Sequence, residues 1–295
     1  MPVKKLSALY FSFILLLITS IIGCILLRIP DKNNGDGYSF IIKSGKTIRE
    51  QDAHITTGKL YFGKSGLGKN LVCYKISPPG EVKTKLLMTY EIHGFEDTTT
   101  NGLPDGQPVR DGGTLVAMAN RIVRYFENHK SALGKTALYI IPSTNPDGLS
   151  DGYTKDGPGR CQVTLGIDLN RDFGCNFVTY TESRNHTLAK PFSAPESRAV
   201  RDLYDAVKPN AVIDCHGWAD TFIGNGWLAG CFKTSLGVYS QRDFSSGDHG
   251  YWSLWAASQG ANAMLIEYPE AAYTQPNLYA DRTIEGIKTY AAQAK

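Results

Sequence analysis

The sequence predicts an α/β fold in which helices cover a largely parallel sheet. Along residues 38–295, apolar runs of strand length alternate with amphipathic stripes of helical period, and we find no internal repeat or low-complexity segment. With 42% hydrophobic and 20% charged residues, the 295-residue chain is long enough to bury a large core. We therefore expect one large domain rather than two small ones.

Strands are expected where short apolar runs are bounded by turn residues. The predicted strands are residues 71–76, 86–92, 137–141, 211–213 and 261–266. The first two bracket Pro78-Pro79-Gly80 and are expected to be adjacent, and the third ends at Pro142. The last two are short and consist mostly of apolar residues.

Helices are expected where apolar residues recur on one side of a longer segment. The predicted helices are residues 113–128, 194–207 and 279–294. Pro195 lies in the first turn of the second one, where proline is favoured. Because these helices alternate with the strands, the functional site is expected where strand ends meet loops.

A long apolar segment precedes this domain. Lys4 and Lys5 are followed by residues 6–27, which carry no charge, and then by Arg28. About 20 apolar residues span a bilayer, whereas the apolar part of a secretory signal is shorter. Because the basic flank stays inside, residues 1–28 predict that the rest of the chain lies at the outer face of the membrane.

The form of this segment stays open among three interpretations. Ile21-Ile22-Gly23-Cys24 resembles a bacterial lipobox with Cys24 acylated, yet the run stays apolar after Cys24, as in a signal-anchor helix. A cleaved signal, which would give a secreted protein, is the third. In each case residues 29–37 form a polar tether and residues 38–295 form the domain.

The net charge and the cysteine spacing exclude some classes of partner and of metal site. The formal charge is +3 and we find no Lys/Arg-rich tract, so we expect no nucleic-acid partner. The 6 cysteines lack the CxxC spacing of a zinc ribbon. If the exterior is oxidising, Cys161 and Cys175 are the expected disulfide pair. Cys73 and Cys215 are expected to be small buried side chains in strands.

Two histidines and a glutamate follow predicted strands. His93 and Glu96 come directly after residues 86–92, and His216 ends an apolar run that begins at Ala211. His93 and Glu96 could also be unrelated residues of a surface loop, and His216 could be a hydrogen-bonded histidine of the core. Catalytic zinc takes three protein ligands and keeps a fourth position open for water. Taken together, the three residues predict a zinc site.

Four further polar residues are candidates for the same site. Asn170 and Arg171 are suited to hold a carboxylate, because the guanidinium fork matches it in two hydrogen bonds. Arg160 is a second candidate cation. Glu267 ends an apolar strand, where burial of a carboxylate is costly without a function or a partner. It is therefore a candidate general base, although a glutamate facing solvent would fit the same position.

In order and context, these motifs resemble the zinc carboxypeptidase family, the M14 peptidases, in a bacterial, membrane-anchored form. The matching segments are HGFE, PSTNPDG, GIDLNRDF, IDCHGW and LIEYP, spread over the chain from Leu86 to Pro269. Residues 61–69 also look like the opening strand and turn of bacterial members. The resemblance implies a single catalytic domain with a mixed, mainly eight-stranded sheet flanked by helices.

The resemblance also implies roles for the individual residues. One Zn2+ per chain would be held by His93, Glu96 and His216. Glu267 would act as general base toward a zinc-activated water and then pass the proton to the leaving amine. Arg160, together with zinc, would stabilise the oxyanion, although it lies in a loop of variable length.

Several further assignments follow from the same resemblance. Asn170 and Arg171 match the pair that grips the terminal carboxylate of the substrate, and Asp168 matches the acid that orients the first zinc histidine. Tyr251 is closest to the family's substrate-capping tyrosine, but it also fits an aromatic wall with its tryptophan neighbours. Glu270 competes with Glu267 for the role of base.

The implied function is that of a zinc metallocarboxypeptidase that hydrolyses a C-terminal peptide bond of a peptide or muropeptide, cell-wall stem peptides among them. The alternatives are a peptidoglycan γ-glutamyl-diamino-acid endopeptidase, a small-molecule deacylase and an inactive peptide-binding protein. Side-chain preference depends on loops within residues 220–260. Only about 30 residues separate the membrane segment from the first domain strand, so we expect no autoinhibitory prodomain.

Overall fold

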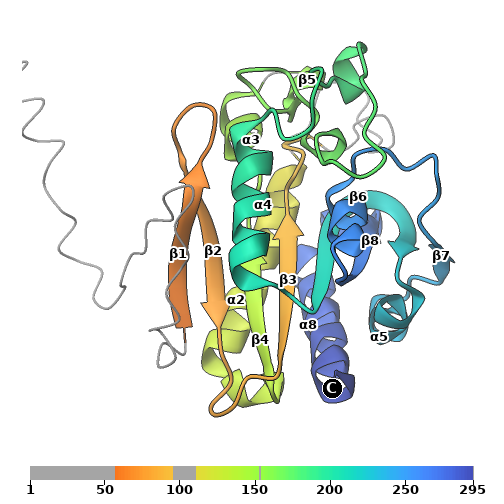
Figure 1. The fold of residues 1–295 in the computed structure, drawn as a ribbon. Helices are drawn as coiled ribbons and strands as arrows, with labels where there is room; N and C mark the ends of the chain where they lie inside the picture. Colours follow the sequence, from red (N-terminus) through yellow and green to blue (C-terminus); the bar gives the residue numbers. More distant parts are fainter. Residues whose placement is uncertain (1–56, 96–110, 153, 295) are drawn as a thin grey trace, which may run out of the picture. The chain divides into compact units, whose positions relative to one another are not determined.

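A mixed sheet of seven strands forms the centre of the domain (Figure 1). The computed structural model describes residues 57–95, 111–152 and 154–294, all of which belong to one compact unit, Tyr38–Lys295. The strands are β1 (Thr57–Lys64), β2 (Asn70–Ile76), β3 (Thr84–Tyr90), β4 (Thr136–Ile141), β5 (Thr154–Cys161), β6 (Ala211–Gly224), β7 (Ser240–Arg242) and β8 (Asn262–Pro269). All of them except β5 belong to the sheet.

Helices and short 3-10 turns connect the strands. The helices are α2 (Gly112–Asn128), α3 (Pro146–Asp151), α4 (Pro195–Val207), α5 (Gly226–Leu236), α6 (Trp252–Ser258), α7 (Ala271–Thr274) and α8 (Pro276–Gln293). The 3-10 turns are η2 (Lys130–Leu133), η3 (Leu169–Arg171) and η4 (Ser183–Asn185). Side chains of α2, α5 and α8 pack in the core on one face of the sheet, and those of α4 and α6 in the core on the other.

The order of the strands begins β1-β2-β4-β3-β6. The pairs β1–β2 and β2–β4 are antiparallel, whereas β4–β3 and β3–β6 are parallel. The expectation of a largely parallel sheet therefore holds for the centre, while one edge is antiparallel. Because β4 lies between β2 and β3, the prediction that residues 71–76 and 86–92 form adjacent strands is wrong. The chain returns through α2, the kind of crossover that parallel strands require, and places β4 beside both.

The long strand β6 folds back around β8. Its first arm, from Ala211, pairs in parallel with one edge of β8, so that His216 lies beside Glu267. After a bend at Asp220, which has a φ of 53°, the second arm returns along the other edge, where Thr221 lies beside the same Glu267. Counted as two arms, β6 brings the sheet to eight strand segments, in agreement with the expected mixed, mainly eight-stranded sheet.

The strand predicted at residues 86–92 ends earlier, at Tyr90. Glu91 follows it with a φ of 51°, a left-handed conformation that stops the extended backbone. Glu91 is fully buried, and its carboxylate accepts a hydrogen bond from the Ser143 hydroxyl. The turn at Glu91 therefore directs the segment that carries His93.

The expected disulfide is not formed. Cys161 and Cys175 are both free, so this prediction is wrong. The Cys161 Sγ lies 3.4 Å from the carbonyl oxygens of Ser183 and Arg184, inside the protein, while Cys175 packs against the core on the α4 face. Cys73 and Cys215 are fully buried in β2 and β6, as expected.

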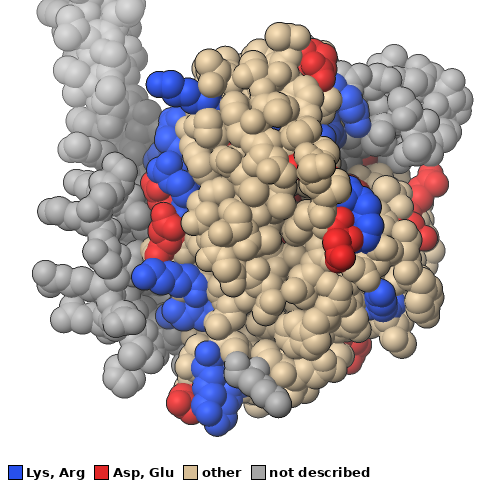
Figure 2. All heavy atoms as spheres, turned by 45° about the vertical axis from the view of Figure 1, so that its right-hand side comes forward, with Lys and Arg blue, Asp and Glu red and all other residues tan. Residues whose placement is uncertain are grey.

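The predicted membrane segment and tether, residues 1–28 and 29–37, lie outside the described residues. Within the described ranges, no helix combines the length and the apolar character that a membrane span requires. On the face drawn in Figure 2, Lys and Arg side chains are interspersed with Asp and Glu, and uncharged surface lies between them.

Candidate active site

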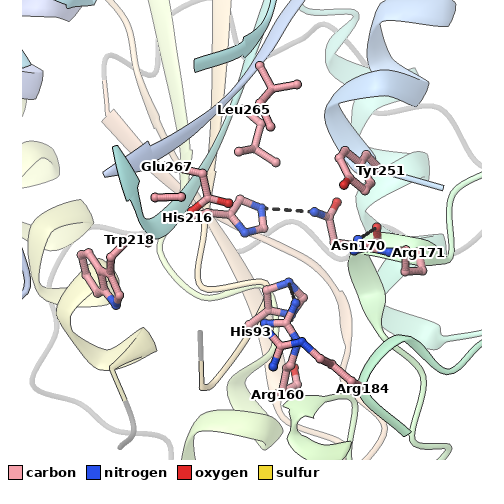
Figure 3. A pocket seen from close by; sticks show the side chains of 13 residues that line it. His93, Arg160, Asn170, Arg171, Arg184, His216, Trp218, Tyr251, Leu265 and Glu267 are labelled. Carbon is pink, nitrogen blue, oxygen red and sulfur yellow. Dashed lines mark hydrogen bonds between the residues drawn. The ribbon is translucent and has the colours of Figure 1, made fainter. Parts of the chain in front are cut away.

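A pocket of about 230 Å3 opens where β3 and β8 end and β6 bends (Figure 3). The labelled residues that line it are His93, Arg160, Asn170, Arg171, Arg184, His216, Trp218, Tyr251, Leu265 and Glu267. The structure thus brings most of the predicted site residues to one place. Glu96, the predicted third metal ligand, lies outside the described residues.

His216 is held by a buried chain of hydrogen bonds. Its Nε2 donates to Asp214 Oδ2 at 2.9 Å, and the other oxygen of Asp214 accepts from the Thr89 hydroxyl at 2.8 Å. Thr89 in turn accepts from the indole Nε1 of Trp252 at 3.0 Å. Because Asp214, Thr89 and Trp252 are fully buried, this chain fixes the tautomer and the orientation of the His216 ring.

His93 is held less tightly. Its Nδ1 lies 3.4 Å from the Arg160 carbonyl oxygen, and its Nε2 lies 3.2 Å from Nη2 of the same arginine. The Asp168 carboxylate, predicted to orient this ring, is 3.8 Å from Nδ1, which is beyond hydrogen-bond distance. Asp168 instead accepts from the Asn170 backbone N–H at 2.9 Å. Burial, followed by the charge of Arg160, holds the pKa of His93 well below its usual range, so the ring is neutral.

The chemistry of these donors fits a zinc ion. The His93 and His216 ring centroids are 5.3 Å apart, and both rings are buried. A neutral imidazole is the form that binds zinc. Because a guanidinium only donates, His93 Nε2 accepts from Arg160 Nη2, and a metal bound at this nitrogen would replace that contact. His216, whose Nε2 donates to Asp214, carries its lone pair on Nδ1. Within the described part of the chain, no three His, Cys, Asp or Glu side chains form a complete metal site.

Glu267 lines the pocket beside His216 (Figure 3). Its Oε2 is buried and has no hydrogen-bond partner in the described structure. Burial raises the pKa of Glu267, while its interactions with His216 and Arg160 oppose this effect. A carboxylate with a raised pKa next to a metal site is suited to accept and release a proton. Glu270 is exposed and does not line the pocket, so the geometry favours Glu267 of the two.

Three residues form the end of the pocket that is predicted to bind a carboxylate. Asn170 Oδ1 accepts from the Trp252 backbone N–H at 3.0 Å, and Arg171 Nη1 donates to the Asn170 carbonyl at 2.9 Å. The Arg171 guanidinium lies 4.7 Å from the centre of the Tyr251 ring. Tyr251 therefore lines the pocket with Arg171, whereas Trp252 and Trp255 stack on each other in the core.

Sequence reasoning missed two residues of this site. Asp214 lies two positions before His216, hence on the same face of β6, and this spacing was a usable signal. Arg184 lies in η4, and its neighbours carry no motif that points to the pocket.

Comparison with known proteins agrees with this geometry. Residues 45–227 match the model of the zinc carboxypeptidase family. Glu267 and Tyr251 lie beyond the matched residues, so their assignment rests on the site itself. Bacteriocin BCN5 of Clostridium perfringens is 34% identical over 234 residues, which cover 78% of this chain and 25% of the relative. The chain thus spans about a quarter of the length of that curated relative.

Solved structures share the fold at low identity. Bovine thrombin-activatable fibrinolysis inhibitor, in complex with tick carboxypeptidase inhibitor, aligns with a TM-score of 0.62 at 17% identity, covering 81% of this chain and 90% of that one. Murein-tripeptide amidase MpaA from Escherichia coli O157 aligns with a TM-score of 0.55 at 18% identity, covering 77% and 91%. With more than half of its residues matched by the family model, the chain belongs to the zinc carboxypeptidase family of metallopeptidases.

Proposed function

We propose that this chain is a zinc-dependent carboxypeptidase that removes one residue from the C-terminus of a peptide. The observation that supports the proposal is that Glu267, His93, His216, Asn170 and Arg171 line one pocket. There they would serve as the proton acceptor, two metal ligands and a carboxylate clamp. An enzyme that cuts within a chain has less use for such a clamp.

The clamp determines which bond is cut. Arg171 and Asn170 receive the terminal carboxylate through charge-assisted hydrogen bonds, and Tyr251 closes this end of the pocket. Asn170 Nδ2 is only 3.5 Å from His216 Nε2, so a residue held by the clamp presents its own peptide bond to the histidines. This arrangement supports release of a single residue.

The remaining residues carry out proton transfer and charge stabilisation. His93, His216 and, by the family motif, Glu96 would hold the zinc ion, which would supply Lewis acidity toward water and the scissile carbonyl. Glu267 takes a proton from the attacking water and delivers it to the leaving amine. Arg160, next to His93, donates to the oxygen that gains negative charge.

A muropeptide is the second candidate substrate. The fold similarity to murein-tripeptide amidase supports a bond between a γ-glutamyl group and a diamino acid as the bond that is cut. We also propose, from residues 1–28, that the domain acts at the outer face of the membrane or after secretion. Digestion of intact cells with an external protease checks the location, because a cytoplasmic domain would be protected.

The test uses the full chain, purified in detergent and loaded with zinc. We expect release of single C-terminal residues from peptides with a free carboxylate, loss of this activity with a chelator, and about 100-fold slower cleavage of the same peptides as C-terminal amides. Muropeptides are included as a separate arm. Internal cuts alone would exclude the exopeptidase, and binding without cleavage would indicate a peptide-binding protein.

A further inference from the structure

Trp252 has two N–H groups, and each leads to a different residue of the pocket. Trp252 is the first residue of α6, where a backbone N–H has no partner within the helix. This N–H donates to Asn170 Oδ1 at 3.0 Å. The indole Nε1–H donates to the Thr89 hydroxyl at 3.0 Å, and from there the hydrogen bonds continue to Asp214 and His216. A single residue thus contacts the predicted clamp and, through two others, a predicted metal ligand.

The backbone contact determines how the Asn170 side chain is turned. Because a backbone N–H only donates, the amide oxygen faces Trp252 and the NH2 group is left for the pocket, which Asn170 lines. The NH2 group is the end of the amide from which a carboxylate can accept a hydrogen bond. The backbone of Trp252 therefore orients Asn170 for the terminal carboxylate of a peptide.

The indole contact determines the direction of the hydrogen bonds that lead to His216. An indole N–H only donates, so the Thr89 oxygen accepts and the hydroxyl proton goes to Asp214. Thr89 and Asp214 are register partners in the parallel pair of β3 and β6, which places their side chains on the same face of the sheet. Both Asp214 oxygens then act as acceptors, and His216 Nε2 donates to the second one. Nδ1 is the ring nitrogen that remains for a metal.

The indole ring cannot turn away from Thr89 without disrupting the core. Trp252 is fully buried, and its ring centroid lies 5.2 Å from that of Phe173, 5.7 Å from that of Trp255 and 5.9 Å from that of Tyr204. All four rings belong to the core on the α4 face of the sheet. A donor on a ring held in this way keeps one position, as the orientation of a metal ligand requires.

We propose that Trp252 is a positioning residue of the metal centre. Its indole N–H, acting through Thr89 and Asp214, keeps His216 in the tautomer and orientation that bind zinc, while its backbone N–H separately holds the clamp. The inference rests on the proposed function, because it takes His216 as a zinc ligand and Asn170 as part of the clamp. Loss of the indole N–H should therefore weaken the zinc site and leave the clamp unchanged.

Trp252→Phe tests this division, because phenylalanine keeps an aromatic ring and the backbone N–H but lacks the indole N–H. On the full chain, we expect the dissociation constant of Zn2+, measured by competition with a chromophoric chelator, to rise about fivefold. At saturating zinc, kcat should fall about fivefold, while KM for peptides with a free C-terminal carboxylate should stay within about twofold of the parent.

Variants of two neighbouring residues serve as controls. Trp255→Phe makes the same change in the ring that stacks on Trp252 but gives no atom to the chain of hydrogen bonds, so zinc affinity should not change. Thr89→Val should weaken zinc binding at least as much as Trp252→Phe. Thr89→Ser, which keeps the hydroxyl, should stay within about threefold of the parent. Circular dichroism and urea unfolding show whether each variant has folded.

A double variant separates positioning from general stability. If the indole acts through Thr89, adding Trp252→Phe to Thr89→Val should change the zinc constant by less than about twofold, because the step between the two residues is already broken. A tryptophan that only fills space would lower zinc affinity by the same factor in both backgrounds.

The outcomes separate this inference from the proposed function. An unchanged zinc constant in Trp252→Phe, a loss that Trp255→Phe matches, or a KM that rises as much as the zinc constant would overturn the positioning role while the carboxypeptidase stands. If Thr89→Val does not fold, the comparison of Trp252→Phe with Trp255→Phe decides. If the parent cleaves no peptide, the proposed function fails, and the zinc constants still decide the role of the indole, with calorimetric binding of the peptides in place of KM.

Discussion

Two glutamates of the domain, Glu267 and Glu196, resemble each other, although the first is half-buried and the second fully buried. Glu267 ends β8 at the pocket, and Glu196 lies in the first turn of α4, where it accepts a hydrogen bond from the Gly66 backbone N–H at 2.7 Å. Each has an Oε2 that is buried without a hydrogen-bond partner in the described structure. Burial raises the pKa of both, that of Glu196 to about 7.

The surroundings of the two side chains differ, and the difference favours a catalytic role for Glu267 and a structural role for Glu196. Glu267 shares a pocket with His216 and Arg160, whereas Glu196 lies beside the carboxylate of Asp147 and lines neither of the described pockets. Asp147, like Glu196, stabilises the turn after β1, because its Oδ2 accepts a hydrogen bond from the Leu67 backbone N–H at 2.7 Å. A raised pKa alone would make either glutamate a candidate general base, whereas the position at the pocket favours Glu267.

The largest effect is expected from Glu267→Gln. The amide keeps the shape of the side chain but cannot accept the proton of water, so kcat should fall about a thousandfold. Zinc content should not change, because Glu267 is not a predicted ligand. Steady-state kinetics and metal analysis measure the two quantities.

Glu270→Gln is the control for that variant. Glu270 is exposed and does not line the pocket, so kcat should change by no more than about twofold. An active Glu267→Gln together with an inactive Glu270→Gln would assign the base to Glu270 and reverse the comparison.

A smaller effect is expected from substitution of the two carboxylates that lie next to the histidine rings. Asp214→Asn replaces the acceptor that lies 2.9 Å from His216 Nε2, and zinc affinity should fall about 10- to 100-fold. Asp168→Asn should cost less, under about tenfold, because Asp168 is 3.8 Å from His93 Nδ1. Competition with a chromophoric chelator measures both constants. A larger loss in Asp168→Asn would show that His93 is the ring held more firmly by its carboxylate.

The convergence of the site was predictable from the sequence. His93, His216 and Glu267 each follow an apolar strand, and the carboxyl ends of parallel strands meet at one edge of a sheet. The helix predicted at residues 194–207 was also recovered within one residue, as α4, since Pro195 marks its first turn. These features depend on local pattern alone.

Other features depend on partners distant in the sequence. Nothing in residues 71–92 indicates that β4 lies between β2 and β3, because that pairing is decided by where α2 returns the chain. The role of Asp214 requires Thr89 on the neighbouring strand, and the reversal of β6 requires β8 between its arms. Cys161 and Cys175 are close in sequence, yet they form no disulfide, and Cys161 is fully buried whereas Cys175 is half-buried.

The smallest effect on the site, and a clear effect on stability, is expected from Glu196→Gln. A carboxyl whose pKa rises from 4.5 to about 7 on folding favours the folded state in its neutral form. The stabilisation is complete below about pH 4.5 and is lost as the pH rises through 7, a change of up to about 3 kcal/mol. The glutamine stays neutral, so urea unfolding at pH 5 and pH 8 should show a smaller difference in the variant than in the parent. Glu285→Gln, an exposed residue paired with Lys288, should leave the difference unchanged, and kcat should be the same in all three proteins. If Glu196→Gln lowered kcat at full zinc occupancy, the two glutamates would share a function that the pocket geometry assigns to Glu267 alone.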